Sequence, residues 1–259
     1  MISEFPAIGG RHPARAARGG AVAVGLMLTL ASCAGGPVSS GINDPNEAQN
    51  REIHAFNLAV DSKILKPVSG ALGGDGQGPL QKGVANFAEN IGLPAVVLND
   101  VLQLRLGKAL ENTVRFSVNT VVGIGGLLDP ASAMGVTGDK TDFGETLHVW
   151  GVEEGPYVEL PFVGPSTSRD TLGMIVDLMI DPVSIFLPEP ERYVGIASKM
   201  VAKVGDRARY SETVDSILYD SADSYAQARL LYLQNRRFEL GQVGDDSSFE
   251  DPYEDSYGQ

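Results

Sequence analysis

The chain has 259 residues, a net charge of −13 and 43% hydrophobic residues, which is enough to build one large domain with a core. This acidic balance argues against nucleic acid as a partner, because phosphate binding needs clustered lysine and arginine. It also leaves the chain without the polybasic patch that draws proteins to anionic membrane surfaces.

Residues 1–32 are typical of a lipoprotein signal peptide. Three arginines precede an apolar run over 21–31, which is too short to span a membrane as a mature helix, and Leu-Ala-Ser-Cys follows at 30–33. Cys33 is the single cysteine of the chain, so we expect it to carry a covalent lipid. The alternative is an ordinary signal peptide followed by an incidental cysteine. By analogy with bacterial lipoproteins, alanine rather than aspartate at position 34 favours sorting to the outer membrane.

Composition divides the remaining chain into three parts. Residues 33–43 are small and polar and predict a flexible tether, and residues 44–240 carry the helical patterns of a folded domain. Residues 241–259 contain six acidic residues and neither lysine nor arginine, so this tail is predicted to be disordered.

Helical spacing of apolar residues, with caps and prolines as boundaries, predicts an all-α domain. Asp44 is expected to cap the first helix, which Pro67 ends, and strand signals are sparse, with 158–162 as one isolated extended piece. The later helices are expected to start at Pro79 and Pro94 and to cover 107–122, 192–203, 209–219 and 222–237.

The segment 142–170 is rich in glycine and proline, yet it carries large apolar side chains that a disordered linker would lack. It predicts a short helix capped by Asp142 and stopped at Gly151, then a compact loop, then a helix capped by Ser166 or Ser168. A long ordered loop of this kind favours a functional role, although a static scaffold is the alternative.

Beyond this segment, Asp177 and Asp181 interrupt an apolar stretch four residues apart and are expected to share a helix face. They line a water-filled path or are solvated on an outer face, and the sequence does not decide between these readings. Two histidines outside the signal and a lipidated cysteine do not make a zinc site, and no nucleophile motif supports a triad around His148. We therefore expect no metal, no cofactor besides the lipid on Cys33, and no enzymatic activity.

The motifs of 142–170 closely resemble the MlaA (VacJ) family of outer-membrane lipoproteins, and the resemblance extends over most of residues 44–237. The matching residues are Asn50, Arg51, Phe56, Asn57, Phe143, Gly144, Thr146, Leu147, Gly155, Pro156, Tyr157, Pro161, Arg169 and Asp170. The resemblance implies a single disc-like helical domain that lies in the inner leaflet of the outer membrane, with a central amphipathic channel.

The resemblance also implies a non-enzymatic function. Such a protein removes phospholipids that have strayed to the outer leaflet and passes them to a soluble periplasmic carrier, often beside a trimeric porin. A structural lipoprotein that tethers or scaffolds the envelope is one alternative, and a lipid hydrolase is another.

Within this picture, residues 134–155 are predicted to form a hairpin or hinged flap beside the channel mouth, whose position controls lipid passage. The candidate hinges are Gly144, Gly151 and Gly155, and His148 and Trp150 are candidate rim residues. The alternative is a rigid loop in which each glycine only satisfies a turn.

Overall fold

The computed structural model describes residues 41–71, 78–186, 188, 189 and 193–242. The chain separates into two units, residues 1–45 and residues 46–259, and every described helix and strand belongs to the second. The predicted signal peptide, Cys33 and most of the tether and tail lie outside the described residues.

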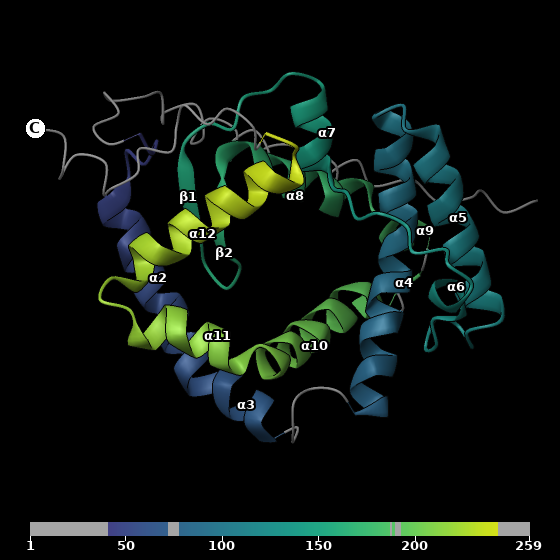
Figure 1. Cartoon of the computed structure of the whole chain (residues 1–259), viewed down its shortest axis with the longest axis horizontal. Coiled ribbons are helices and arrows are strands. Elements are labelled where there is room, and N and C mark those ends of the chain that lie inside the picture. Colours follow the sequence, from purple (N-terminus) through teal and green to yellow (C-terminus); the bar gives the residue numbers. More distant parts are fainter. Residues whose placement is uncertain (1–40, 72–77, 187, 190–192, 243–259) are drawn as a thin grey trace, which may run out of the picture. The chain divides into compact units, whose positions relative to one another are not determined.

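The second unit is helical apart from one small hairpin, as the sequence predicts (Figure 1). The described elements, with π-helices labelled η, are α2 (Glu47–Val60), η1 (Asp61–Leu65), α3 (Lys66–Ala71), α4 (Pro79–Leu102), α5 (Leu106–Val121), α6 (Pro130–Ala133), α7 (Phe143–Val149), β1 (Tyr157–Leu160), β2 (Gly164–Thr167), α8 (Ser168–Ile180), α9 (Pro182–Phe186), α10 (Val194–Arg209), α11 (Ser211–Asp215), η3 (Ser216–Asp220) and α12 (Ser224–Glu239).

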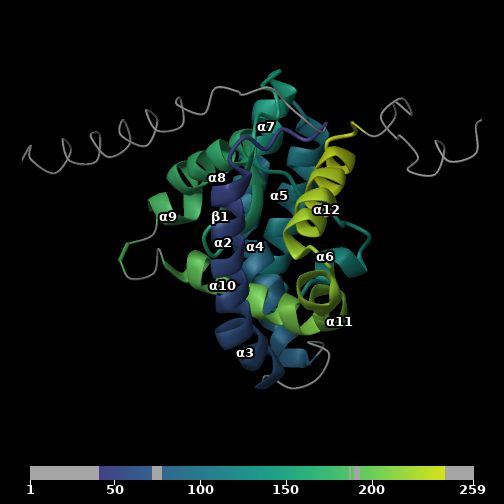
Figure 2. The same ribbon diagram turned by 90° about the vertical axis from the view of Figure 1, so that its left-hand side faces the viewer.

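Two predicted helix breaks are wrong, and in both cases a proline is accommodated. Pro67 is the second residue of α3, and the π-turn η1 directly before it joins α2 to α3 in one line (Figure 2). Pro94 lies inside α4, which packs against both α5 and α10 and continues past it. The first helix also begins later than predicted, because Asn46 and not Asp44 precedes its first residue.

The helix ends around 142–181 are partly as predicted. The Oδ1 of Asp142 accepts the Glu145 amide at 2.8 Å, and Gly151 follows α7 with φ +87°. The cap of α8 is Thr167, whose hydroxyl accepts the amide of Asp170 at 3.2 Å, so the expected serine caps are wrong.

The later helices also differ from their predicted limits. Asp181 lies beyond the end of α8 and therefore does not share a helix face with Asp177. The helix α10 runs on to Arg209, six residues past its predicted end at 203, and α11 and η3 follow it to Asp220.

The extended piece near Pro161 is not isolated, because β1 pairs with β2 in an antiparallel hairpin. Tyr157 faces Thr167 at one end of the register and Leu160 faces Gly164 at the other, so Pro161 falls in the turn and costs no ladder hydrogen bond. Phe162 in the same turn has φ +64°, a left-handed conformation that is unusual for a residue other than glycine.

The interior of this unit is polar and much of its surface is apolar. Among the described residues, 21 buried side chains are polar or charged and nine are hydrophobic, the reverse of the usual preference. Hydrogen bonds compensate much of this burial: Thr146, for example, donates to Asn99 at 2.8 Å and accepts from Gln103 at 2.8 Å.

Helix α5 shows this inversion most clearly. Its buried positions are Ala109, Asn112, Arg115 and Asn119, whereas Leu106, Leu110, Val114 and Val121 on its outer face are exposed. An amphipathic helix in a water-soluble protein has the opposite arrangement. Among the described residues, no helix is long and apolar enough to cross a bilayer.

Candidate functional site

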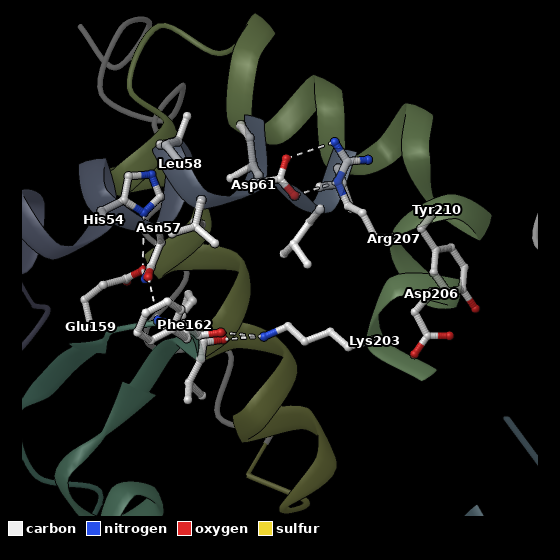
Figure 3. Close-up of a pocket in the computed structure, with 18 residues that line it drawn as sticks. His54, Asn57, Leu58, Asp61, Glu159, Phe162, Lys203, Asp206, Arg207 and Tyr210 are labelled. Atoms are coloured by element: carbon white, nitrogen blue, oxygen red, sulfur yellow. Dashed lines mark hydrogen bonds and ion pairs between the residues drawn. The ribbon is translucent and has the colours of Figure 1, made fainter. Parts of the chain in front are cut away.

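A pocket of about 310 Å³ lies among α2, η1, the β1–β2 hairpin, α10, α11, η3 and α12 (Figure 3). Ten of its eighteen lining residues are apolar: Leu58, Val60, Leu65, Phe162, Val163, Gly164, Pro165, Val214, Leu218 and Ala228. The other eight are polar or charged: His54, Asn57, Asp61, Glu159, Lys203, Asp206, Arg207 and Tyr210. The surface of the pocket is therefore mainly apolar, with a few charged side chains in its walls.

One wall of the pocket is a buried ion pair. Arg207 donates from Nε to Asp61 Oδ1 at 2.8 Å and from Nη2 to Oδ2 at 3.0 Å, and it also contacts Asp215 (Figure 3). The hydroxyl of Tyr219 donates to Asp61 Oδ2 at 2.8 Å, and burial together with this bond raises the pKa of Tyr219 to about 12. These charges satisfy one another and form a rigid part of the pocket.

A second wall is the buried carboxylate of Glu159 on β1. It accepts hydrogen bonds from Asn57 Nδ2 at 3.1 Å and from the Tyr157 hydroxyl, and His54 Nδ1 lies 3.4 Å away. The Glu159 amide donates to Asn50 Oδ1 at 3.0 Å, so α2 holds both the backbone and the side chain of this strand.

Lys203 reaches across from α10 to the turn of the hairpin. Its ammonium donates to the backbone oxygens of Phe162 at 2.9 Å and Val163 at 3.2 Å (Figure 3). Although part of the side chain reaches solvent, the surrounding protein atoms desolvate the ammonium and lower the pKa of Lys203. Asn57 Oδ1 accepts the Phe162 amide at 2.8 Å, so the strained turn is held from two sides.

The four candidate channel or rim residues lie elsewhere and do not line this pocket: Asp177, Asp181, His148 and Trp150. Asp177 accepts the Phe143 amide at 2.9 Å and Asn99 Nδ2 at 2.9 Å, and burial raises its pKa. Asp181 accepts the backbone amide of Val183 at 3.3 Å, just beyond α8.

The other two rim candidates flank the end of α7. Trp150 donates to the Leu102 carbonyl at 3.2 Å and packs edge-on against Phe143. Burial and the charge of Arg169 lower the pKa of His148. A role at a channel rim therefore stays a prediction for these residues.

The three candidate hinges differ in their surroundings. Gly151 and Gly155 have positive φ in the loop after α7, where the backbone conformation favours glycine. Gly144 instead lies in the first turn of α7, where an added Cβ would come 2.6 Å from Asp170 Oδ1. Its small size allows α7 to pack against α8, so the structure gives Gly144 a packing role, while hinge motion stays a prediction.

Comparison with known proteins assigns the chain to a family. A model of the MlaA lipoprotein family matches residues 42–239. The chain belongs to this family. The MlaA intermembrane phospholipid transport system lipoprotein of Escherichia coli K12 is 33% identical over 222 residues, which cover 84% of this chain and 86% of that protein. The MlaA lipoprotein of Haemophilus influenzae is 28% identical over 223 residues, covering 82% and 86% respectively.

A solved structure gives the same result for the fold. That structure concerns the structural basis for maintenance of bacterial outer membrane lipid asymmetry. It matches with a TM-score of 0.65 and 30% identity, and the match covers 76% of this chain and 98% of that one. The MlaA resemblance that the sequence indicated is therefore confirmed.

The MlaA motif residues are dispersed over supporting contacts rather than gathered at one reactive centre. Arg51 forms a two-bonded ion pair with Asp223, and its guanidinium lies 4.5 Å from the ring centre of Tyr225. Asp170 accepts hydrogen bonds from Arg236 and from the Tyr232 hydroxyl. Most of these residues fix the MlaA fold.

Sequence reasoning singled out Asn57 but missed His54, Glu159 and Lys203, which line the pocket. A lone histidine, glutamate or lysine on a helix or strand carries no recognisable spacing. Glu159 offered a weak signal, as an acid between the apolar residues of β1. Among the described residues, no cluster of three or more histidine, cysteine or acidic side chains could hold a metal ion.

Proposed function

We propose that this protein is a lipid-anchored outer-membrane protein that removes mislocalised phospholipids from the outer leaflet and passes them to a soluble periplasmic carrier. Its relatives in Escherichia coli and Haemophilus influenzae bear the name of an intermembrane phospholipid transport lipoprotein. The solved structure that it resembles concerns outer-membrane lipid asymmetry.

The observation that carries this proposal is a mainly apolar pocket with a few charged side chains in its walls. A volume of about 310 Å³ is at the lower limit of the roughly 300–1,000 Å³ of ligand pockets, too small for a lipid with two acyl chains. A headgroup would meet Lys203 at the pocket wall, while the first carbons of the chains meet the apolar lining residues. The rest of each chain then stays in lipid.

The inverted surface supports a position in a membrane leaflet. Apolar side chains along the outer face of α5 would meet acyl chains at no cost in solvation, whereas in water they would form an exposed patch. The buried polar network keeps the helices together, since lipid provides no hydrophobic force between them. We propose that the domain lies flat in the inner leaflet as a disc, anchored through lipidated Cys33 beside a porin trimer.

A deletion strain of the Gram-negative host tests the proposal. Loss of the protein should raise the amount of phospholipid in the outer leaflet, and plasmid-borne wild type should restore it. Leu218→Trp adds bulk inside the pocket and should fail to restore it, whereas Val201→Trp, on the exposed side of α10 outside the pocket lining, should succeed.

Two other results would count against transport. A tether or scaffold predicts altered cell shape or envelope spacing on deletion, with normal lipid asymmetry. A hydrolase predicts that the purified protein releases fatty acid or lysolipid from vesicles. Equal rescue by both tryptophan variants would show that the pocket is not the path.

A further inference from the structure

We infer that the pocket recognises a zwitterionic headgroup, with Lys203 binding the phosphate and Asp206 binding a primary ammonium. This inference rests on the proposed function and adds a lipid preference to it. It is based on Lys203 and Asp206, which lie three residues apart on α10. Both residues line the pocket, and they are not paired with each other (Figure 3).

The position of Lys203 suits it to bind a phosphate. Its ammonium carries three N–H donors, of which two go to the carbonyls of Phe162 and Val163. Those carbonyls carry no charge, and Lys203 forms no ion pair with any residue that the structure describes. The third donor and the whole positive charge therefore remain for an anion, at a position that the hairpin turn fixes.

Asp206 supplies the opposite charge one helical turn further on. Residues three apart on a helix are neighbours on its surface, with Cβ atoms about 5–6 Å apart. The side chain of Asp206 is exposed at the pocket lining and, within the described part of the chain, forms no ion pair. Lys203 is directed toward the hairpin instead, so the two charges present separate ends of one surface (Figure 3).

The other charged groups of the pocket already have partners. Asp61 and Arg207 neutralise each other through two hydrogen bonds, and Glu159 is enclosed by its bonds to Tyr157 and Asn57. A ligand therefore meets one available positive charge and one available negative charge in this pocket.

A phosphoethanolamine headgroup has matching chemistry. It carries one phosphate and one primary ammonium, joined by a two-carbon bridge, so its two charges are complementary to those of Lys203 and Asp206. A phosphoglycerol headgroup has the phosphate but no cation, and it leaves Asp206 facing additional negative charge. Like charges brought together in one site disfavour a complex, so the pocket should favour the zwitterion.

Competition between two lipids tests the inference. The full-length lipidated protein in detergent is incubated with equal amounts of phosphatidylethanolamine and phosphatidylglycerol of the same acyl chains. After gel filtration, the bound lipids are extracted and quantified by mass spectrometry. We expect an enrichment of phosphatidylethanolamine of up to about fivefold, the upper end of the range for one exposed charge pair.

The variants separate the two contacts. Asp206→Asn should abolish the enrichment but leave total bound lipid nearly unchanged, and Lys203→Met should lower the binding of both lipids. Lys203→Arg keeps the charge and should retain binding, which guards against misfolding as the cause. Lys199→Met and Glu212→Gln, exposed residues of α10 and α11 outside the pocket lining, are the charge-matched controls.

Soluble competitors separate a headgroup from free phosphate. Phosphoethanolamine should displace bound lipid better than inorganic phosphate does, and equal displacement would overturn the inference. Equal binding of both lipids by the wild type would also overturn the inference, but it would not contradict the proposed function in phospholipid transport. A protein that binds neither lipid would instead refute the proposed function.

Discussion

Loss of the guanidinium of Arg207 should destabilise the protein strongly. Arg207→Met leaves the buried carboxylate of Asp61 with the Tyr219 hydroxyl as its remaining partner, since both bonds from the guanidinium disappear. Removing one partner of a buried ion pair costs about 3–5 kcal/mol. At about 2–4 °C per kcal/mol for a domain of this size, the melting temperature should fall by about 6–20 °C.

Thermal unfolding in detergent, followed by circular dichroism, measures this fall. Arg51→Met is the matched control, because it also removes one arginine from a two-bonded pair, but Arg51 and Asp223 are 40% and 45% exposed. An exposed pair contributes about 0.2–1 kcal/mol, so this variant should lose no more than about 4 °C. Asp61→Asn combined with Arg207→Met should recover part of the loss. Equal falls for the two single variants would refute the burial argument.

Three further predictions concern other parts of the molecule. Burial alone would raise the pKa of Asp170, but Arg236 holds this pKa below its usual range. The ionised Asp170 therefore contributes stability above about pH 4, and this contribution is lost as pH falls through the pKa that Asp170 has in the folded protein. Between about pH 3 and 6, the melting temperature should depend less on pH for Asp170→Asn than for the wild type. An equal pH dependence of the two proteins would contradict this. Gly126→Ala should cost about 2–4 kcal/mol, because φ is +94° and the new Cβ would overlap a buried side chain. Gly151→Ala, with open space around it, should cost about 1 kcal/mol in the same denaturation assay. Cys33→Ala should leave the precursor without its lipid, which acylation assays and membrane fractionation would measure. A variant that is acylated normally and fractionates with the outer membrane would contradict this.

Local chemistry made part of the fold predictable. Asp142 and Gly151 mark the two ends of α7, because a side-chain cap and a left-handed glycine act within one turn of the chain. Pro67 and Pro94 misled the prediction, since their effect depends on hydrogen-bond register and on packing against distant helices. Single-sequence patterns do not contain that information.

The site was less predictable than the fold, for a related reason. Lys203 is separated by about 40 residues from the carbonyls that it binds, and Glu159 by more than 100 from His54 and Asn57. Each of these contacts arises only when α2, the hairpin and α10 come together. The family resemblance located Asn57 but gave no reason for it, whereas the structure shows that its amide holds both Glu159 and the Phe162 turn.

The inverted distribution of side chains, most evident along α5, also has a thermodynamic consequence. Exposure of apolar surface raises the heat capacity on unfolding, and exposure of polar surface lowers it. A protein that hides amides and carboxylates while keeping leucines and valines at its surface should therefore show a heat-capacity increment well below the usual ~12–15 cal/mol/K per residue. Its stability curve should be shallow, with an unfolding enthalpy that changes little between a cold and a warm environment.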